Sequence, residues 1–106
     1  MPASRPKGLR DLDEIDAVFA ALAHAARRSI LQVLYARNGS MTAGEVALRF
    51  SHSWPTTSRH LGILVRAGLI TVRRDGRARH YVLERERLAR VLSLWLYAVG
   101  LRIEER

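Results

Sequence analysis

Hydrophobic residues recur every three or four positions in the first quarter of the chain, a spacing that predicts an amphipathic helix. The face so formed consists of Leu12, Ile15, Phe19, Leu22 and Ala26. Acidic side chains crowd residues 11–16, where the dipole of a helix that starts there favours negative charge. Residues 1–8 hold two prolines, a glycine and no apolar run, and we expect a disordered basic lead-in to one domain over residues 9–106.

A second helix is predicted over residues 26–37, after a bend at His24 and Ala25. Its inward face holds Ile30, Leu31 and Leu34. The pair Asn38 and Gly39 is expected to end this helix, because both residues tolerate a positive φ.

A third, shorter helix is predicted to begin after Thr42. Thr42 and Glu45 have the spacing of a capping box, in which each side chain accepts a hydrogen bond from the backbone N–H of the other residue. Its expected core face consists of Val46, Leu48 and Phe50. Residues 51–53 break the helical pattern.

A fourth helix follows over residues 54–67. Ser53 can cap it, and Pro55 suits its first turn, where a missing backbone N–H costs nothing. The residues predicted to face inward are Thr57, Leu61, Leu64, Val65 and Gly68.

Beyond residue 68 the pattern changes from helical to β. Residues 69–74 and 78–83 are rich in β-branched and aromatic side chains, and Asp75 and Gly76 join them in a predicted hairpin. A last helix is predicted over residues 84–103. Two short helices followed by a hairpin are typical of a winged helix-turn-helix, so we expect a mainly α (α+β) fold with about five helices and a β-hairpin wing.

The charge is concentrated in this predicted module. Eighteen basic against ten acidic residues give a net charge of +8, which indicates a polyanionic partner. Seven arginines and one acid, Asp75, lie within residues 49–79, so +6 of this charge falls there. The chain has no cysteine and no apolar run long enough to cross a membrane, and we expect a cytoplasmic protein without disulfides or thiolate metal sites.

In a winged helix-turn-helix, the second helix of the pair enters the major groove of DNA and the hairpin touches the backbone beside it. We therefore expect residues 54–67 to be the recognition helix and residues 73–80 the wing. The candidate DNA-binding residues are Ser53, Thr56, Thr57, Ser58, Arg59, His60, Arg74, Arg77 and Arg79.

Arg59 is the candidate for a base contact, because a guanidinium can bridge the two acceptors of guanine. Arg74 and Arg77, expected to face each other beside the turn, suit phosphates. Plain structural alternatives exist: Ser53 can serve only as a cap, and Ser58 can bond back to the preceding turn.

Three stretches, residues 19–34, 53–70 and 74–83, together resemble the ArsR/SmtB family of bacterial repressors. The most specific part is Thr57-Ser-Arg-His-Leu, followed by Ala67-Gly-Leu-Ile and a Gly-Arg-x-x-x-Tyr hairpin. The usual Asp-Pro-Thr-Arg of the family is replaced by His24-Ala-Ala-Arg27, and its common valine by Thr57. The resemblance implies a homodimer that binds an operator of dyad-related half-sites in double-stranded DNA and represses transcription until an inducer releases it.

The metal-sensing residues that the family uses are missing. The third helix has no Cys-x-Cys, and the last helix has neither the Asp-x-His nor the His-x-x-Glu set. The four histidines are not spaced to place two ligands on one helical face. We expect no metal and no cofactor, and an unidentified small-molecule or protein effector stays open.

The last helix is apolar on nearly every side, and a domain this small cannot bury all of it. One face is expected to meet a second copy across a twofold axis, with the first helix contributing. The predicted dimer interface consists of Leu12, Ile15, Phe19, Leu92, Trp95, Leu96 and Val99. Alternatively, Trp95 and Tyr97 line a small-molecule pocket.

We therefore predict a sequence-specific DNA-binding transcriptional regulator, a dimeric repressor that recognises a palindromic operator. The alternative is a winged-helix protein-interaction module that binds another protein through its apolar last helix. An enzyme is disfavoured, because the chain has no cysteine, no phosphate-cradling glycine loop and no Ser-His-Asp set with a visible logic.

Overall fold

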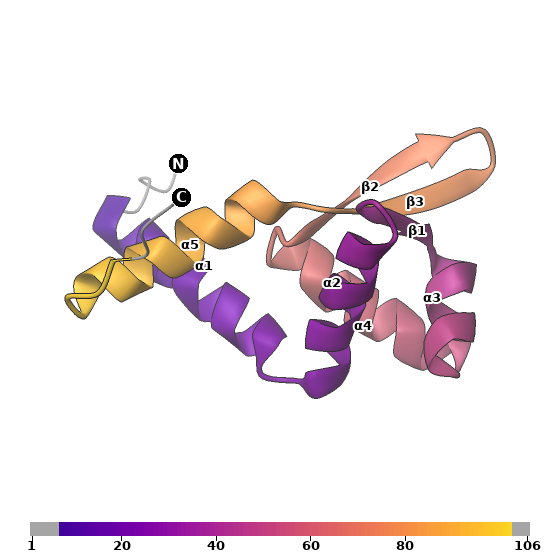
Figure 1. Ribbon diagram of the computed structural model, residues 1–106, viewed down its shortest axis with the longest axis horizontal. Helices are drawn as coiled ribbons and strands as arrows, with labels where there is room; N and C mark the ends of the chain where they lie inside the picture. The colour runs from indigo at the N-terminus through magenta and orange to yellow at the C-terminus, as the bar shows by residue number, and fades with distance from the viewer. Residues whose placement is uncertain (1–6, 103–106) are drawn as a thin grey trace, which may run out of the picture.

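The computed structural model describes residues 7–102 of the chain (Figure 1). In chain order the elements are α1 (Lys7–Leu22), α2 (Ala25–Ala36), β1 (Ser40–Thr42), α3 (Ala43–Phe50), α4 (Trp54–Arg66), β2 (Ile70–Asp75), β3 (Ala78–Leu83) and α5 (Arg85–Ala98). The predicted mainly α fold with five helices and a hairpin wing is confirmed. Helices α1 and α5 lie side by side at one end, whereas α3, α4 and the hairpin lie at the other (Figure 1).

Helix α1 begins earlier than the hydrophobic pattern predicts. Lys7 and Gly8, assigned to a disordered lead-in, already belong to it, and residues 1–6 lie outside the described residues. The acids of residues 11–16 therefore lie beyond the first turn, and the expected dipole stabilisation there is wrong. Ala26, placed on the same face, belongs to α2, because the chain bends at residues 23–24, one residue before the bend predicted at His24 and Ala25.

Four helices end in the same way, with a left-handed residue followed by a backbone bond that reaches back five residues. The left-handed residues are Asn38, Ser51, Gly68 and Gly100, with φ values of 62°, 55°, 76° and 83°. The following N–H groups donate to the carbonyl oxygens of Leu34, Ala47, Leu64 and Leu96 at 2.7, 3.1, 3.0 and 2.8 Å. This arrangement is the Schellman motif, and it satisfies carbonyl groups that a helix end leaves without partners. It also ends α5 at Ala98, five residues before the predicted end.

The start of α3 is held by the predicted capping box. Glu45 N–H donates to Thr42 Oγ1 at 3.2 Å, and Thr42 N–H donates to Glu45 Oε1 at 2.9 Å. Leu48 was expected in the core, but 84% of it is exposed, because Val46 alone of α3 is fully buried and Leu48 lies on the opposite side of this short helix.

The sheet has three strands in the order β1-β3-β2, and the sequence pattern missed β1. Residues 40–42 pair antiparallel with residues 80–82 of β3, so the base of the wing is joined to the segment between α2 and α3. In the hairpin, Arg74 is opposite Arg79 and Asp75 is opposite Ala78, which leaves Gly76 and Arg77 as the two-residue turn. The expected pairing of Arg74 with Arg77 is wrong.

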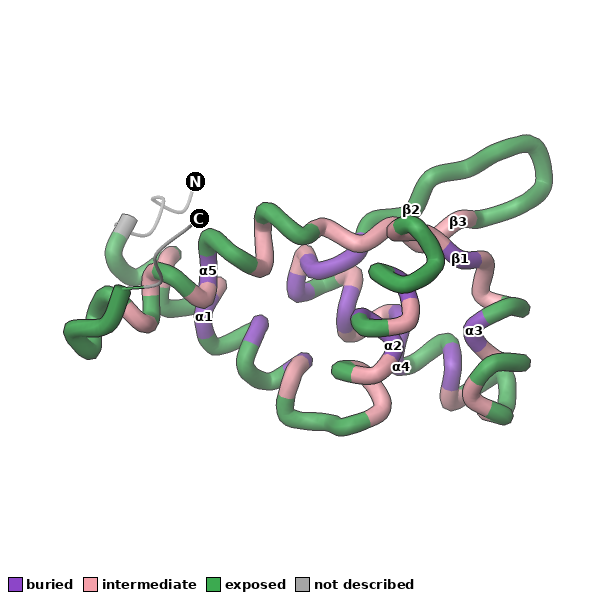
Figure 2. Tube along the Cα trace, in the orientation of Figure 1, coloured by how far each residue is buried: buried purple, intermediate pink, exposed green. Residues whose placement is uncertain are grey.

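The core lies between the helices and the base of the sheet, while the outer half of the hairpin is exposed (Figure 2). Its largest fully buried side chains include Ile30, Leu34, Met41, Leu61, Leu64, Leu69 and Ile70. Since these residues come from α2, β1, α4, β2 and the link between α4 and β2, the core holds the recognition helix and the wing in one body.

Candidate DNA-binding surface

Helix α4 presents its N-terminal end to solvent, and its first turn is organised by Ser53. Thr56 N–H donates to Ser53 Oγ at 3.3 Å, and Ser53 Oγ donates in turn to Thr56 Oγ1 at 3.0 Å. Pro55 occupies the first turn, as predicted. Ser53 donates its hydroxyl hydrogen to Thr56, so that hydrogen is not available to DNA. The Thr56 hydroxyl accepts this bond and can still donate its own hydrogen to a DNA phosphate.

Two of the predicted DNA-binding side chains are buried within the protein itself. Thr57 is fully buried, on the same helical face as Leu61 and Leu64. His60 is 5% exposed, and its ring faces the start of α2. Both residues are withdrawn as DNA contacts, because a base or phosphate cannot reach a side chain that the domain already covers.

The exposed side of α4 carries Ser58 and Arg59. Neither side chain is needed for the core, so both are available to a groove of DNA that receives this helix. Arg66, also exposed, bends back over Gly62 near the other end of the helix.

A hollow of about 370 Å³ lies between the start of α3, the recognition helix and the wing. Its walls include Gly44, Trp54, Ser58, Arg77 and Arg79. Three predicted DNA-binding residues from two separate elements are therefore brought to one place. A hollow with two guanidinium groups at its rim suits a negatively charged strand.

Trp54 is a candidate that the sequence interpretation missed. It is 62% exposed at the first position of α4 and borders the hollow beside Ser58. A tryptophan in this position offers a flat apolar surface for a sugar or a thymine methyl group. Its helical phase gave no signal, because Trp54 is seven residues before Leu61 and so has the spacing of the predicted inward face.

The wing carries a dense positive charge. Arg74, Arg77 and Arg79 are all exposed, and the Cα atoms of Arg74 and Arg79 are direct cross-strand partners. Like charges in this arrangement repel each other unless an anion lies between them. Within residues 8–102, no carboxylate forms an ion pair with these three arginines or with Arg59.

A second surface, made by α1 and α5, is apolar. Leu12, Phe19, Trp95 and Val99 are exposed, whereas Leu92 and Leu96 are half-buried. Ile15 was predicted in the dimer interface, but it is buried in the core of its own chain and is withdrawn. Arg90 of α5 donates to Glu14 of α1 at 2.8 Å and ties the two helices together.

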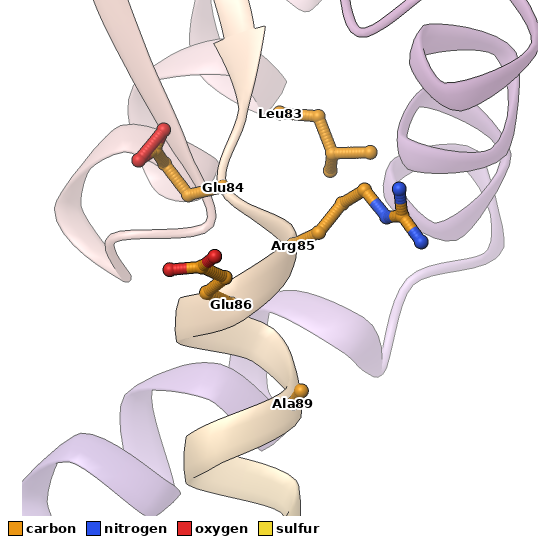
Figure 3. Close-up of a pocket in the computed structure, with 5 residues that line it drawn as sticks. All are labelled: Leu83, Glu84, Arg85, Glu86 and Ala89. Carbon is orange, nitrogen blue, oxygen red and sulfur yellow. The ribbon is translucent and has the colours of Figure 1, made fainter. Parts of the chain in front are cut away.

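The other hollows do not collect reactive groups. At the start of α5, a hollow of about 530 Å³ is bordered by Glu84, Arg85 and Glu86, but the two carboxylates point away from the guanidinium (Figure 3). Among the described residues, no three histidine or carboxylate side chains are placed to hold a metal ion. Tyr97 borders a hollow of about 430 Å³ on α5 that Trp95 does not reach.

None of the helices within residues 7–102 is both long and apolar enough to cross a bilayer.

Comparison with known proteins agrees with this geometry. Residues 22–73 match a family described as a helix-turn-helix domain. The transcriptional repressor SdpR of Bacillus subtilis (strain 168) is 42% identical over 66 residues, which cover 62% of this chain and 71% of that protein.

Solved structures give the same fold. An ArsR-like transcriptional regulator from Rhodococcus sp. RHA1 superimposes with a TM-score of 0.72 and 28% identity, covering 84% of this chain and 81% of the other. A second similar structure is the homodimeric winged helix-turn-helix DNA-binding domain of a possible ArsR-family regulator from Mycobacterium bovis. The match covers 100% of this chain and 98% of the other, with a TM-score of 0.70 and 23% identity.

Proposed function

The chain belongs to the ArsR family of winged helix-turn-helix DNA-binding transcriptional regulators, and from this premise we propose that it is a homodimeric repressor that reads a palindromic operator. Helix α4 enters the major groove, and the wing of β2 and β3 lies on the adjacent backbone. The observation that carries the proposal is the placement of α4, which carries the exposed Arg59, at the same end of the molecule as the wing, whose arginines are exposed as well.

Each exposed side chain has a separate role in this complex. Arg59 reads a guanine through two parallel hydrogen bonds, since its guanidinium has no acid partner within residues 8–102. Thr56 and Ser58 donate to phosphates or base edges, and Trp54 contacts the sugars or a thymine methyl group. Arg74, Arg77 and Arg79 of the wing neutralise phosphates, which relieves the repulsion across the hairpin.

Dimerisation follows from the apolar surface at the other end. Leu12, Phe19, Trp95 and Val99 are exposed on α1 and α5, and a twofold axis through this surface buries them in both chains. An isologous dimer carries two copies of α4 related by the same axis. Its operator must then have dyad symmetry, with half-sites about one helical turn apart or a multiple of it.

Repression needs only that the dimer occupy a promoter and exclude the transcription machinery. We place this activity in the cytoplasm, where such a regulator meets its operator. A small-molecule or protein effector would release the dimer by favouring a conformation with lower affinity for DNA.

Selection from a random duplex library tests this proposal. Purified protein is bound to the library in about 0.15 M salt, and retained duplexes are sequenced after several rounds. The expected result is one enriched motif with dyad symmetry. A library that stays unenriched would contradict sequence-specific binding, and an enriched motif without symmetry would contradict the dimer.

The protein-interaction alternative makes a different prediction for the apolar surface. A chain that uses α5 only to hold another protein stays monomeric when purified alone. Its mass would then be 12.0 kDa at every concentration. The proposed repressor has twice that mass.

A further inference from the structure

One buried histidine of the recognition helix is bonded to the start of α2. Arg27 Nη1 lies 3.3 Å from His60 Nδ1. A guanidinium can only donate hydrogen bonds, so Nδ1 is the acceptor and the proton of the neutral ring is on Nε2. The contact therefore exists only while His60 is uncharged.

The same arginine also holds the end of α1. Arg27 Nε donates to the carbonyl oxygen of Ala21 at 2.8 Å, and Nη2 donates to that of Ala20 at 3.2 Å. These carbonyls lie in the last turn of α1, where positive charge is favourable. One side chain thus connects α1, part of the proposed dimer surface, with α4, the proposed recognition helix.

The groups around His60 are aromatic or basic. The ring of His24, from the N-cap of α2, lies 4.8 Å from that of His60, and the ring of His52, from the turn before α4, lies 5.5 Å from it. Phe50 stacks on His52 at 5.7 Å. Burial lowers the pKa of His60 below its usual range, and its basic neighbours His24, Arg27, His52 and Arg59 lower it further, because a second positive charge beside them is unfavourable.

We propose that Arg27 and His60 are positioning residues that set α4 against α1, and that protonation of His60 breaks their contact, so that affinity for the operator falls in mild acid. A charged His60 loses its acceptor and faces Arg27 at close range. The ring is driven from its site, and the first turns of α4 lose their fixed orientation relative to α1. The inference rests on operator binding by α4, as proposed above.

The direction of this pH dependence, a loss of operator affinity as the pH falls, is the opposite of the usual one. DNA phosphates attract protons, so histidines beside DNA normally strengthen binding as the pH falls, in the way that added cations do. His60 acts in the opposite direction, because its protonated form cannot keep the contact that positions α4. A loss of affinity in acid therefore requires a group whose neutral form is needed for binding.

The test measures operator affinity by fluorescence anisotropy between pH 8.0 and 5.5 at constant ionic strength. For the wild-type chain, affinity should be level above about pH 6.5 and fall below it as the pH approaches the lowered pKa of His60, with a limiting slope of about tenfold per pH unit for one coupled proton. His60→Asn keeps an acceptor, Oδ1, in the place of Nδ1 and cannot be protonated. Its affinity should stay within about twofold over the same range.

Arg27→Gln is the second variant, and it serves if His60→Asn does not fold. It removes the charge that a protonated His60 would face. The loss of operator affinity between pH 8.0 and 5.5 should therefore be smaller than in the wild-type chain, even if the affinity at pH 8.0 is itself lower. A purely structural role would lower the whole curve and leave its shape unchanged. His52→Gln is the matched control, and it should keep most of the wild-type loss of operator affinity at low pH.

Two results would overturn the inference: wild-type affinity that is constant or rises between pH 7.5 and 5.5, or an equal acid loss in His60→Asn or Arg27→Gln. Failure of the proposed function looks different, because the wild-type chain would then fail to prefer the operator at pH 8.0 as well. Circular dichroism of the wild-type chain at pH 5.5 is the control for unfolding: a spectrum unchanged from pH 8.0 means that a lower affinity is not due to loss of the fold.

Discussion

The ring of Trp95 meets the ring of Phe19 edge to face, with centroids 5.4 Å apart and planes at 86°. This contact joins α5 to α1, and such aromatic pairs contribute about 0.5–1.5 kcal/mol beyond the area they bury. Neither ring is fully buried in the single chain. The pair therefore joins the two helices and forms part of the apolar surface on which we propose that a second copy packs.

Leu12 gives the clearest test of that surface. It is 54% exposed on α1, so Leu12→Glu should leave the fold of one chain intact. In the dimer the new carboxylate would be buried without a partner, which we expect to weaken association by about 2 kcal/mol or more. Sedimentation equilibrium should show a dimer for the wild-type chain and a monomer for the variant at micromolar concentration.

Leu48→Glu is the matched control for this experiment. Leu48 is more exposed than Leu12 but lies on α3, away from the proposed interface. The variant should dimerise as the wild-type chain does. If Leu12→Glu and Leu48→Glu have the same dissociation constant, the interface has been placed on the wrong surface.

Arg59 and Arg77 should differ in what their loss does to DNA binding. Arg59→Ala is expected to cost about 1–3 kcal/mol on the operator and to relax the choice of base at one position of each half-site. Arg77→Ala should weaken binding to all sequences alike and reduce the salt slope by about one. Binding isotherms on the operator and on single-base variants separate the two effects.

Arg85→Ala controls for the loss of one positive charge. Arg85 lies at the start of α5 with its guanidinium over the ring of Tyr35, away from the recognition helix. It should change operator affinity by less than either variant above. A uniform loss from Arg59→Ala would show that Arg59 contacts a phosphate rather than a base.

Replacement of Gly68, which lies between α4 and the wing, by alanine should destabilise the protein. Its φ is 76°, and a Cβ built there would come within 2.9 Å of the guanidinium of Arg87. Arg87 can move, so the cost comes mainly from the left-handed backbone, and Gly68→Ala should lower the free energy of unfolding by about 1–2 kcal/mol. Urea denaturation measures this difference.

Gly44→Ala is the counterpart inside α3. The nearest atom to its added Cβ would be Thr42 Oγ1 at 3.9 Å, an ordinary contact, and the backbone is helical. This variant should stabilise the protein by about 0.5–1 kcal/mol. Equal destabilisation of both variants would contradict the role given to the left-handed position of Gly68.

His60 should also make stability depend on pH. Because its pKa is lower in the folded chain than in the unfolded one, its contribution is fully present above about pH 6.5 and is lost as the pH falls from there toward the folded-state pKa. The free energy of unfolding of the wild-type chain should therefore decrease over that window more than that of His60→Asn. Parallel curves for the two proteins would show that folding does not lower the pKa of His60.

The elements that the sequence predicts well are those whose signals are local. Thr42 and Glu45 need only each other to form the capping box, and Asn38 needs only its own tolerance of a positive φ. The resemblance to ArsR-type repressors rests on such local segments around α4 and the hairpin. Both the fold and the family could therefore be inferred before any coordinates.

The features that were missed depend on contacts between distant residues. Residues 40–42 are too few to show an alternating pattern, and they form β1 only because β3 pairs with them. His60 lies at the border of the inward face of α4, and the position of Arg27 in space decides that it is buried. Leu48 has the spacing of a core residue, but α3 is short and covers the core only through Val46.

The proposed function depends on the recognition of one operator sequence by α4. Its most direct test compares the affinity of the dimer for the selected palindrome and for a scrambled duplex of the same composition, at several salt concentrations. We expect a dissociation constant of about 10⁻⁸ M or tighter for the palindrome, at least about 10³-fold tighter than for the scrambled duplex, with a steep loss of affinity as salt rises. Equal affinity for the two duplexes would contradict it.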